Sequence, residues 1–267
     1  MRDRLSYEGY TLAFEENFHG PELDRTRWNV ELHKPGWVNE EWQEYVDSPE
    51  NIRLEDGRLL IRPVRTVRDG QAFYTSGRIS TQGRHEFTYG LFEARLKVPR
   101  GKGFLPAFWL MTSDEDTYGQ WPVCGEIDIM EIMGQRPESN YGTIHYGLPH
   151  QQNQGVFTLP SGDFSEEYHV FSLEWEPGLL RWFVDGTLFH EARQWFSASG
   201  RQPPDPFPAP FNHNMYIILN LAVGGNWVGY PDKTTDFENA VFTVEYVRVY
   251  RKNIEGGYAY GKYPFFR

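Results

Sequence analysis

The chain has 267 residues, which suits one large all-β domain, and a formal net charge of −11. This charge argues against nucleic acid and against anionic polymers as partners, because their phosphate or sulfate groups would be repelled. The composition, with 9 Trp, 16 Tyr, 19 Phe, 26 Gly and 18 Pro, favours many short strands and tight turns over helices and suits sugar binding.

The cysteine content, the first residues and the apolar stretches of the chain bear on which class of protein it belongs to. The single cysteine, Cys124, excludes an intrachain disulfide and a cysteine-cluster metal site, and strand parity predicts that it faces the same side as Glu126. We interpret it as a small packing residue rather than a thiol nucleophile. The first residues, MRDRLSYEGYTLAF, lack the apolar core of a signal peptide. No stretch approaches the roughly 18 apolar residues of a transmembrane helix.

The first half of the chain predicts successive strands separated by turns. The segment GWVNEEWQEY, residues 36–45, is predicted as a loop or strand edge. Trp109 either fills the core or lines a cleft, and strand parity leaves both open. The predicted strands are Tyr10–Phe18, a hairpin over Asn51–Arg62 that turns at Asp56-Gly57, Tyr74–Thr81, Tyr89–Val98 and a segment Gly101–Met111.

The most informative stretch is WPVCGEIDIMEIMG, residues 121–134. In a regular strand Glu126 and Asp128 share one face, and Ile127 and Ile129 share the other. Glu131 would point to the wrong face unless one extra residue, a β-bulge around Ile129 or Met130, restores the phase. A bulge therefore predicts three carboxylates on one face.

Such a set of carboxylates suits glycoside hydrolysis, which uses two carboxyl groups that flank one glycosidic bond. The alternative is a solvated strand face, since antiparallel sheets often have one wet face. Three like charges within six residues repel one another, which favours a functional role.

The second half continues the all-β pattern. In Tyr141–Tyr146, alternation places His145 on one face with Tyr141 and Thr143, and a lone histidine is more often structural than catalytic. Residues 168–191 predict paired hairpins, and the Pro-rich segment Gln194–Phe211 is predicted to be irregular. The remaining predicted strands are Met215–Val223 and Val241–Tyr250. Many strands and no internal repeat favour one antiparallel sandwich domain over residues 1–267.

The segment EIDIME, Glu126–Glu131, resembles the E-x-D-x-x-E signature of glycoside hydrolase family 16 in its bulged form. That form is typical of laminarinases and endo-β-1,3(4)-glucanases, and of agarases and carrageenases. The resemblance covers about residues 10–251 and leaves the tail 252–267 unmatched. It implies a β-jelly-roll of two antiparallel sheets with a concave substrate groove.

The resemblance also implies roles for individual residues. Glu126 would be the nucleophile, Glu131 the general acid/base, and Asp128 the group that holds a proton or hydrogen bond between them. His145 would hydrogen-bond a carboxylate or a bound sugar. Substrate contacts are expected from Asn39, Arg78, Trp109 and Trp121, and further contacts in the same loop from Glu41, Trp42 and Gln43.

No cofactor is required for this chemistry, but the family often holds a structural calcium. Here the expected ligands are Asn17, Gly57 and Glu245, with Glu245 where an aspartate is usual and Asn17 where an acidic residue is usual. Glu245 could equally be a surface charge.

The sequence therefore predicts a retaining endo-β-glucanase that cleaves internal β-1,3 or mixed β-1,3-1,4 linkages. It is expected to be an extracellular monomer whose leader has been removed, with a β-glucan as its partner and no membrane or nucleic-acid partner. The alternatives are a non-catalytic β-glucan-binding protein on the same fold and a relative that acts on another polysaccharide such as agarose.

Overall fold

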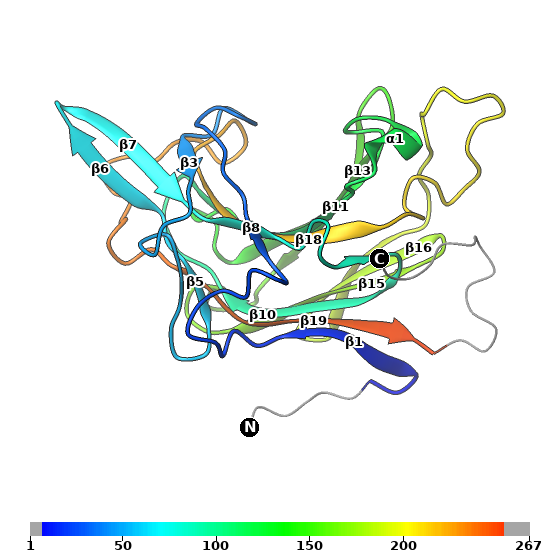
Figure 1. Ribbon diagram of the computed structural model, residues 1–267, viewed down its shortest axis with the longest axis horizontal. Coiled ribbons are helices and arrows are strands. Elements are labelled where there is room, and N and C mark those ends of the chain that lie inside the picture. Colours follow the sequence, from blue (N-terminus) through cyan, green and yellow to red (C-terminus); the bar gives the residue numbers. More distant parts are fainter. Residues whose placement is uncertain (1–6, 254–267) are drawn as a thin grey trace.

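Two large antiparallel sheets, each of eight strands, pack face to face and form the body of the molecule (Figure 1). The structure is a computed structural model that describes residues 7–253, so the predicted tail lies outside the described residues from 254 onward. This architecture is the β-jelly-roll sandwich that the sequence predicts.

The first sheet carries strands from both ends of the described chain. Its strands are β1 (Tyr10–Glu16), β4 (Ile52–Leu54), β5 (Leu59–Ile61), β10 (Gly90–Lys97), β15 (His169–Glu176), β16 (Leu179–Val184), β17 (Thr187–Ala192) and β19 (Phe242–Lys252). They are ordered β17-β16-β15-β10-β19-β5-β4, and β1 also pairs with β19. The predicted hairpins over residues 51–62 and 168–191 are confirmed as β4–β5 and β15–β16–β17.

The second sheet contains the carboxylate strand at its centre. Its strands are β2 (Asn29–Val30), β8 (Arg78–Ser80), β9 (Glu86–Phe87), β11 (Phe104–Met111), β12 (Glu126–Glu131), β13 (Ser139–Tyr146), β14 (Gln151–Thr158) and β18 (Met215–Val223). They are ordered β14-β13-β12-β11-β18-β8-β2, and β9 pairs with β18. A small third sheet, in the order β3-β7-β6, consists of β3 (Gln43–Tyr45), β6 (Val64–Arg68) and β7 (Gln71–Ser76).

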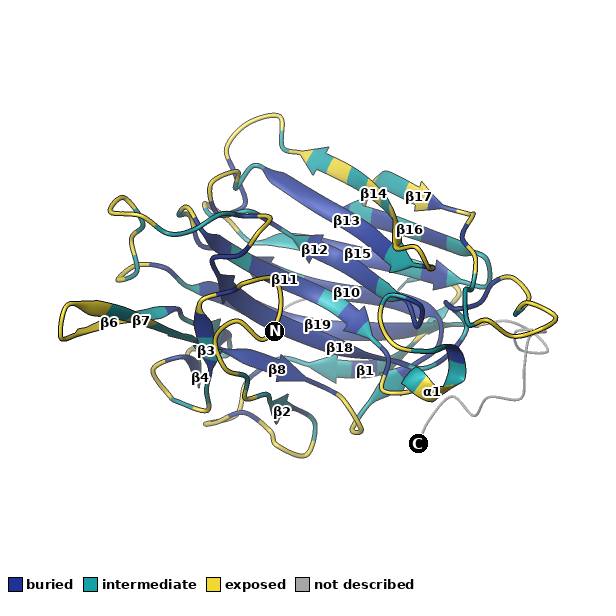
Figure 2. Ribbon diagram, turned by 90° about the horizontal axis from the view of Figure 1, so that it is seen from above, coloured by how far each residue is buried: buried dark blue, intermediate teal, exposed yellow. Residues whose placement is uncertain are grey.

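The hydrophobic core lies between the two large sheets. Ile127 and Ile129, on the face of β12 opposite to Asp128, are almost completely buried in it, as alternation requires. Trp175 and Trp182 reach the same core from the other sheet and are also fully buried. Figure 2 shows buried residues along β10, β13, β18 and β19 and exposed residues in the loops that connect them.

One predicted strand is wrong. The segment Tyr74–Thr81 is two strands, β7 and β8, which belong to different sheets. The break is at Gly77, where an added Cβ would lie 2.5 Å from the Ile52 side chain. The chain can pass this close to Ile52 only without a side chain, and there it leaves the small sheet for the large one.

Strands β2, β6, β9 and β14 are additional to the predicted ones, and β3 lies at the end of the segment 36–45 that is predicted as a loop or strand edge. Cys124 also departs from its prediction, because it lies in the turn before β12 rather than in the strand itself. It is fully buried, and burial raises the pKa of its thiol to about 12, which agrees with a packing residue.

The walls above the second sheet come from chain segments at its two ends. Figure 1 shows β3 and the β6–β7 hairpin at one end, and α1 (Glu115–Tyr118) with the loop around residue 200 at the other. The Pro-rich segment 194–211 contains no strand, as predicted. Within residues 7–253, no helix is long and apolar enough to cross a membrane.

Candidate active site

The bulge in β12 brings the three carboxylates together as predicted. Trp109 of β11 pairs with Asp128, but its neighbour Phe108 pairs with Met130, so Ile129 is the extra residue. On the other side, Asp128 pairs with Thr143 and Glu131 with Tyr141, so four residues of β12 lie opposite three of β13, again one extra. As a result Glu126, Asp128 and Glu131 all line one groove.

Trp182 holds the bulged strand from below. Its indole N–H crosses from the first sheet and donates a hydrogen bond of 2.8 Å to the backbone carbonyl of Asp128. Gly142 on β13 makes room for this ring, because a Cβ at Gly142 would lie 2.6 Å from it. The bulge is therefore fixed by a buried hydrogen bond.

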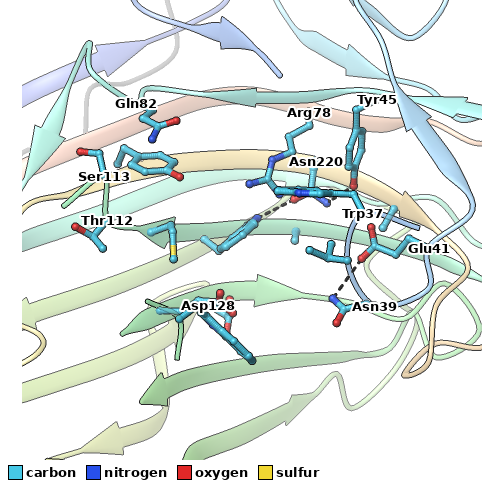
Figure 3. Close-up of a pocket in the computed structure, with 18 of the residues that line it drawn as sticks. Trp37, Asn39, Glu41, Tyr45, Arg78, Gln82, Thr112, Ser113, Asp128 and Asn220 are labelled. Atoms are coloured by element: carbon cyan, nitrogen blue, oxygen red, sulfur yellow. Dashed lines mark hydrogen bonds between the residues drawn. The ribbon is translucent and has the colours of Figure 1, made fainter. Parts of the chain in front are cut away.

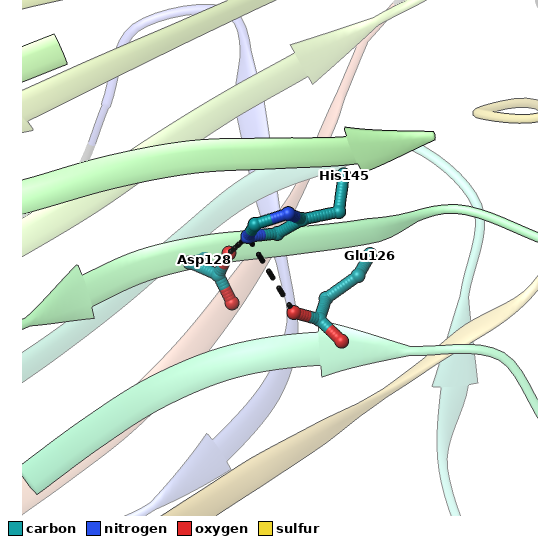
Figure 4. Close-up of side chains that lie close together, drawn as sticks. All are labelled: Glu126, Asp128 and His145. Atoms are coloured by element: carbon teal, nitrogen blue, oxygen red, sulfur yellow. Dashed lines mark ion pairs between the residues drawn. The ribbon is translucent and has the colours of Figure 1, made fainter. Parts of the chain in front are cut away.

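His145 lies beside the carboxylates on β13, where its backbone pairs with Glu126 (Figure 4). Its Nε2 atom is 3.3 Å from Oδ2 of Asp128 and 3.9 Å from Oε1 of Glu126. Its Nδ1 atom forms a hydrogen bond of 2.8 Å with Nε2 of His150. The predicted proximity of His145 to the carboxylates is thus confirmed, and His150 is a neighbour that the sequence analysis missed.

The pKa values of all three carboxylates are raised. Burial is the largest cause for each, and it raises the pKa of Asp128 to about 8. Burial and then the charge of Asp128 raise the pKa of Glu126 to about 8, against opposing effects of His145, Arg78 and a hydrogen bond from Trp121. Burial, followed by the charges of Asp128 and Glu126, holds the pKa of Glu131 well above its usual range. The trio therefore holds at least one proton near neutral pH.

The groove has a volume of about 760 Å³ and runs over the second sheet (Figure 3). Its floor includes Trp109, whose indole N–H donates to Oδ1 of Asn220 at 2.7 Å. The Asn220 amide in turn donates to the Tyr45 hydroxyl at 3.0 Å. Trp109 therefore lines the cleft, which settles the alternative that parity leaves open.

Arg78 enters the groove from β8, beside Asn220 in the strand pairing. Its guanidinium carbon lies 4.8 Å from the ring centroid of Trp109 and 5.2 Å from that of Trp37. Arg78 also donates a hydrogen bond to the Glu31 carboxylate. Burial alone would raise the pKa of Glu31, but the charge of Arg78 and the hydrogen bonds to the carboxylate together outweigh it, and the pKa is lowered. The side chain is thus a fixed part of the groove wall.

The loop of residues 36–45 divides into groove-lining and supporting residues. Asn39 and Glu41 line the groove, and the Asn39 amide lies 3.4 Å from the Glu41 carboxylate. Gln43 accepts a hydrogen bond of 2.7 Å from the Val223 backbone N–H, and Trp42 stacks on Tyr230 with ring centroids 4.4 Å apart. Gln43 and Trp42 are absent from the lining of the groove and support the loop instead.

Two exposed indoles, Trp37 and Trp121, line the groove. Trp121 is 47% exposed, and its ring centroid lies 6.2 Å from that of His145. Trp37, which the sequence analysis did not single out, is 48% exposed and stacks on His33 with centroids 3.5 Å apart. Asn220 was also missed, although a lone amide in the apolar run Met215–Val223 was a signal that could have revealed it.

The three residues of the calcium prediction lie on or beside neighbouring strands of the first sheet, with Glu245 on β19. Glu16, just before Asn17, pairs with Val247, and Leu59, two residues after Gly57, pairs with Val244, so both segments flank Glu245. The Glu245 carboxylate accepts from the Arg95 guanidinium. The placement suits a site that uses backbone carbonyls, and the ion remains a prediction.

The model of "Glycosyl hydrolases family 16" matches residues 37–246. The chain belongs to this family. The family 16 chain is 37% identical to "Glucan endo-1,3-beta-glucosidase A1" of Niallia circulans over 91% of its own length, although the match spans only 38% of that relative. It is also 37% identical to "Glucan endo-1,3-beta-glucosidase" of Cryptopygus antarcticus, with 93% of this chain and 95% of the relative covered.

The same likeness holds in three dimensions. The solved endo-β-1,3-glucanase from Pyrococcus furiosus superposes on this family 16 chain with a TM-score of 0.76 and is 39% identical. The match covers 90% of this chain and 94% of that one. The predicted family and the predicted glycoside hydrolase are therefore confirmed.

Proposed function

We propose that the protein is a retaining endo-β-glucanase that hydrolyses internal β-1,3-glucosidic bonds, and mixed-linkage β-1,3-1,4-glucan as a second substrate. The observation that carries this proposal is the set of three carboxylates on one face of β12, inside an elongated groove. The names of the relatives, glucan endo-1,3-β-glucosidases, support the choice of β-1,3-glucan.

The reaction proceeds by double displacement. Glu126 attacks the anomeric carbon and forms a covalent glycosyl-enzyme, while Glu131 donates its proton to the departing glycosidic oxygen. Glu131 then takes a proton from water, which attacks the same carbon and releases Glu126. Two inversions leave the configuration of the sugar retained.

The electrostatics of the site divide these roles. The acid must hold a proton, and burial with two neighbouring carboxylates raises the pKa of Glu131 well above its usual range. The nucleophile must be ionised. The pKa of Glu126 is itself raised to about 8, so this role requires the loss of its proton, which His145, Arg78 and the Trp121 hydrogen bond favour. Asp128 lies between them on the strand and faces His145, so it can hold a proton that both glutamates share.

The groove supports binding of a neutral sugar chain. Indoles combine a large apolar face with a polar N–H, so Trp37, Trp109 and Trp121 offer stacking surfaces along it. Asn39 and Arg78 supply hydrogen-bond donors between these rings. Trp37 and Trp121 line the groove and are exposed to solvent, so a polymer bound on both could extend past the carboxylates, which suits internal cleavage.

The test is reducing-sugar release and product size on laminarin, mixed-linkage glucan and agarose, with Glu126→Gln as the comparison. We expect release from laminarin first and a loss of at least about a thousandfold in the variant. Asp163→Asn, far from the groove residues in sequence and on no groove wall, serves as the matched control and should retain activity. If the unaltered protein binds laminarin but does not hydrolyse it, the result would support the non-catalytic glucan-binding alternative. Cleavage of agarose would support the alternative of a relative that acts on another polysaccharide.

We also infer the setting in which this enzyme works. A polysaccharide is met outside the cell, so we propose an extracellular monomer. A structural calcium at Asn17, Gly57 and Glu245 would tie β1 and the β4–β5 turn to β19. Size-exclusion chromatography with light scattering tests the oligomeric state.

A further inference from the structure

Beyond its role in hydrolysis, the cluster of Glu126, Asp128 and His145 has the donor set of a transition-metal site. One ligand atom from each residue lies within 4.8 Å of the other two (Figure 4). We propose that this cluster binds a borderline divalent metal ion such as Zn²⁺, and that the bound ion blocks hydrolysis.

The first argument is that the cluster contains a buried side-chain oxygen without a hydrogen-bond partner among the residues that the structure describes. Asp128 is only 2% exposed, and its Oδ2 atom has no hydrogen-bond partner although it points toward Nε2 of His145. An unpaired buried carboxylate oxygen is costly, so a cation at this point would remove a penalty that the folded protein otherwise carries.

The second argument is the hydrogen bond on the far side of the imidazole. Metal-binding histidines use one ring nitrogen for the metal and donate the other N–H to a neighbouring acceptor. In His145, Nδ1 lies 2.8 Å from Nε2 of His150. The tautomer in which Nδ1–H donates to His150 leaves the lone pair of Nε2 directed at Asp128 and Glu126.

The distances suit zinc better than a hard cation. Tetrahedral Zn²⁺ holds nitrogen and oxygen ligands at about 2.0–2.2 Å, which places neighbouring ligands about 3.3 Å apart. The distance from Nε2 of His145 to Oδ2 of Asp128 is already 3.3 Å. Oε1 of Glu126 lies 3.9 Å from the same Nε2 atom, so the Glu126 side chain would have to move slightly closer. Mg²⁺ prefers six oxygen ligands and should bind far more weakly.

Three protein ligands leave one position open, as in zinc sites that exchange ligands. The metal would engage the carboxylate of Glu126, so that the nucleophile could not attack the sugar. The inhibition, though not the binding, rests on the proposed function.

The experiment measures binding of ZnCl₂ by isothermal titration calorimetry, and separately the hydrolysis of laminarin with and without Zn²⁺. We expect saturable binding of one ion, inhibition at the same concentrations, and reversal by EDTA. His145→Asn should raise the Kd for Zn²⁺ at least about tenfold. His169→Asn is the matched control, because among residues 7–253 His169 pairs with a single carboxylate, Asp185 at 2.7 Å, and it should leave the Kd within about twofold.

The outcomes separate this inference from the function. Active protein that binds no Zn²⁺, or whose Kd is unchanged in His145→Asn, would overturn the metal site and leave the glucanase intact. Inactive protein that binds Zn²⁺ through His145 would support the site and overturn the proposed function instead. Equal affinity for MgCl₂ would also contradict the proposed donor set.

Discussion

Replacing Asp128 with Asn should stabilise the protein increasingly as the pH rises from about 5 to about 7.5. Burial raises the pKa of the Asp128 carboxyl from 3.8 to about 8. Between these two values the folded protein keeps a proton that the unfolded chain has released. The contribution of this carboxyl group to the free energy of unfolding is therefore fully present below its unfolded pKa, and it is lost as the pH rises through its folded pKa. Asn has a similar shape and does not titrate.

The size of the effect follows from the width of that window. Each pH unit between the two pKa values costs about 1.4 kcal/mol of unfolding free energy. Over the range from about pH 5 to about pH 7.5, wild type should lose about 3 kcal/mol relative to Asp128→Asn. Asn carries no charge, so the pKa values of Glu126 and Glu131, which the charge of Asp128 raises, should fall in the variant and enlarge this difference in the same direction.

The assay is urea denaturation followed by tryptophan fluorescence, for which the chain has 9 Trp residues. Asp232→Asn is the control, because hydrogen bonds from Thr234 lower the pKa of Asp232 to about 2, and the group is ionised in both states throughout this window. Its stability difference from wild type should not change with pH. If the curve of Asp128→Asn also runs parallel to that of wild type, the raised pKa of Asp128 is refuted.

Three further predictions concern the site and its support. Trp182→Phe removes the N–H that donates to the Asp128 carbonyl, so it should lower the free energy of unfolding by about 1–3 kcal/mol and also lower kcat. The control is Trp195→Phe, which loses a buried hydrogen bond of 2.8 Å to the Pro208 carbonyl. This control should lose similar stability and keep its kcat. His145→Asn should move the acidic limb of the kcat/KM profile to higher pH, because His145 lowers the pKa of Glu126, and an unmoved limb would contradict that coupling. Removing calcium with EDTA should lower the Tm and added CaCl₂ should restore it, whereas identical melting curves would argue against a calcium site.

The sequence alone determined the carboxylate strand. The alternation of charged and apolar residues in EIDIME put Glu126 and Asp128 on one face and the isoleucines on the other, and the phase error at Glu131 required a bulge. Local chemistry was sufficient here because the side-chain period of a strand is fixed by its backbone. The same reasoning predicted the hairpin at Asp56-Gly57 and the absence of strands from the Pro-rich segment.

Only the tertiary structure decided what these strands contact. No local rule shows that Gly77 must pass Ile52 and end one strand, because the two residues lie 25 positions apart in sequence (77 minus 52). The pairing of Arg78 with Glu31 and the support of Asp128 by Trp182 likewise join distant segments. The sequence supplied the reactive groups, and the packing of the two sheets determined their burial and hence their raised pKa values, since desolvation depends on all the chain that surrounds a charge.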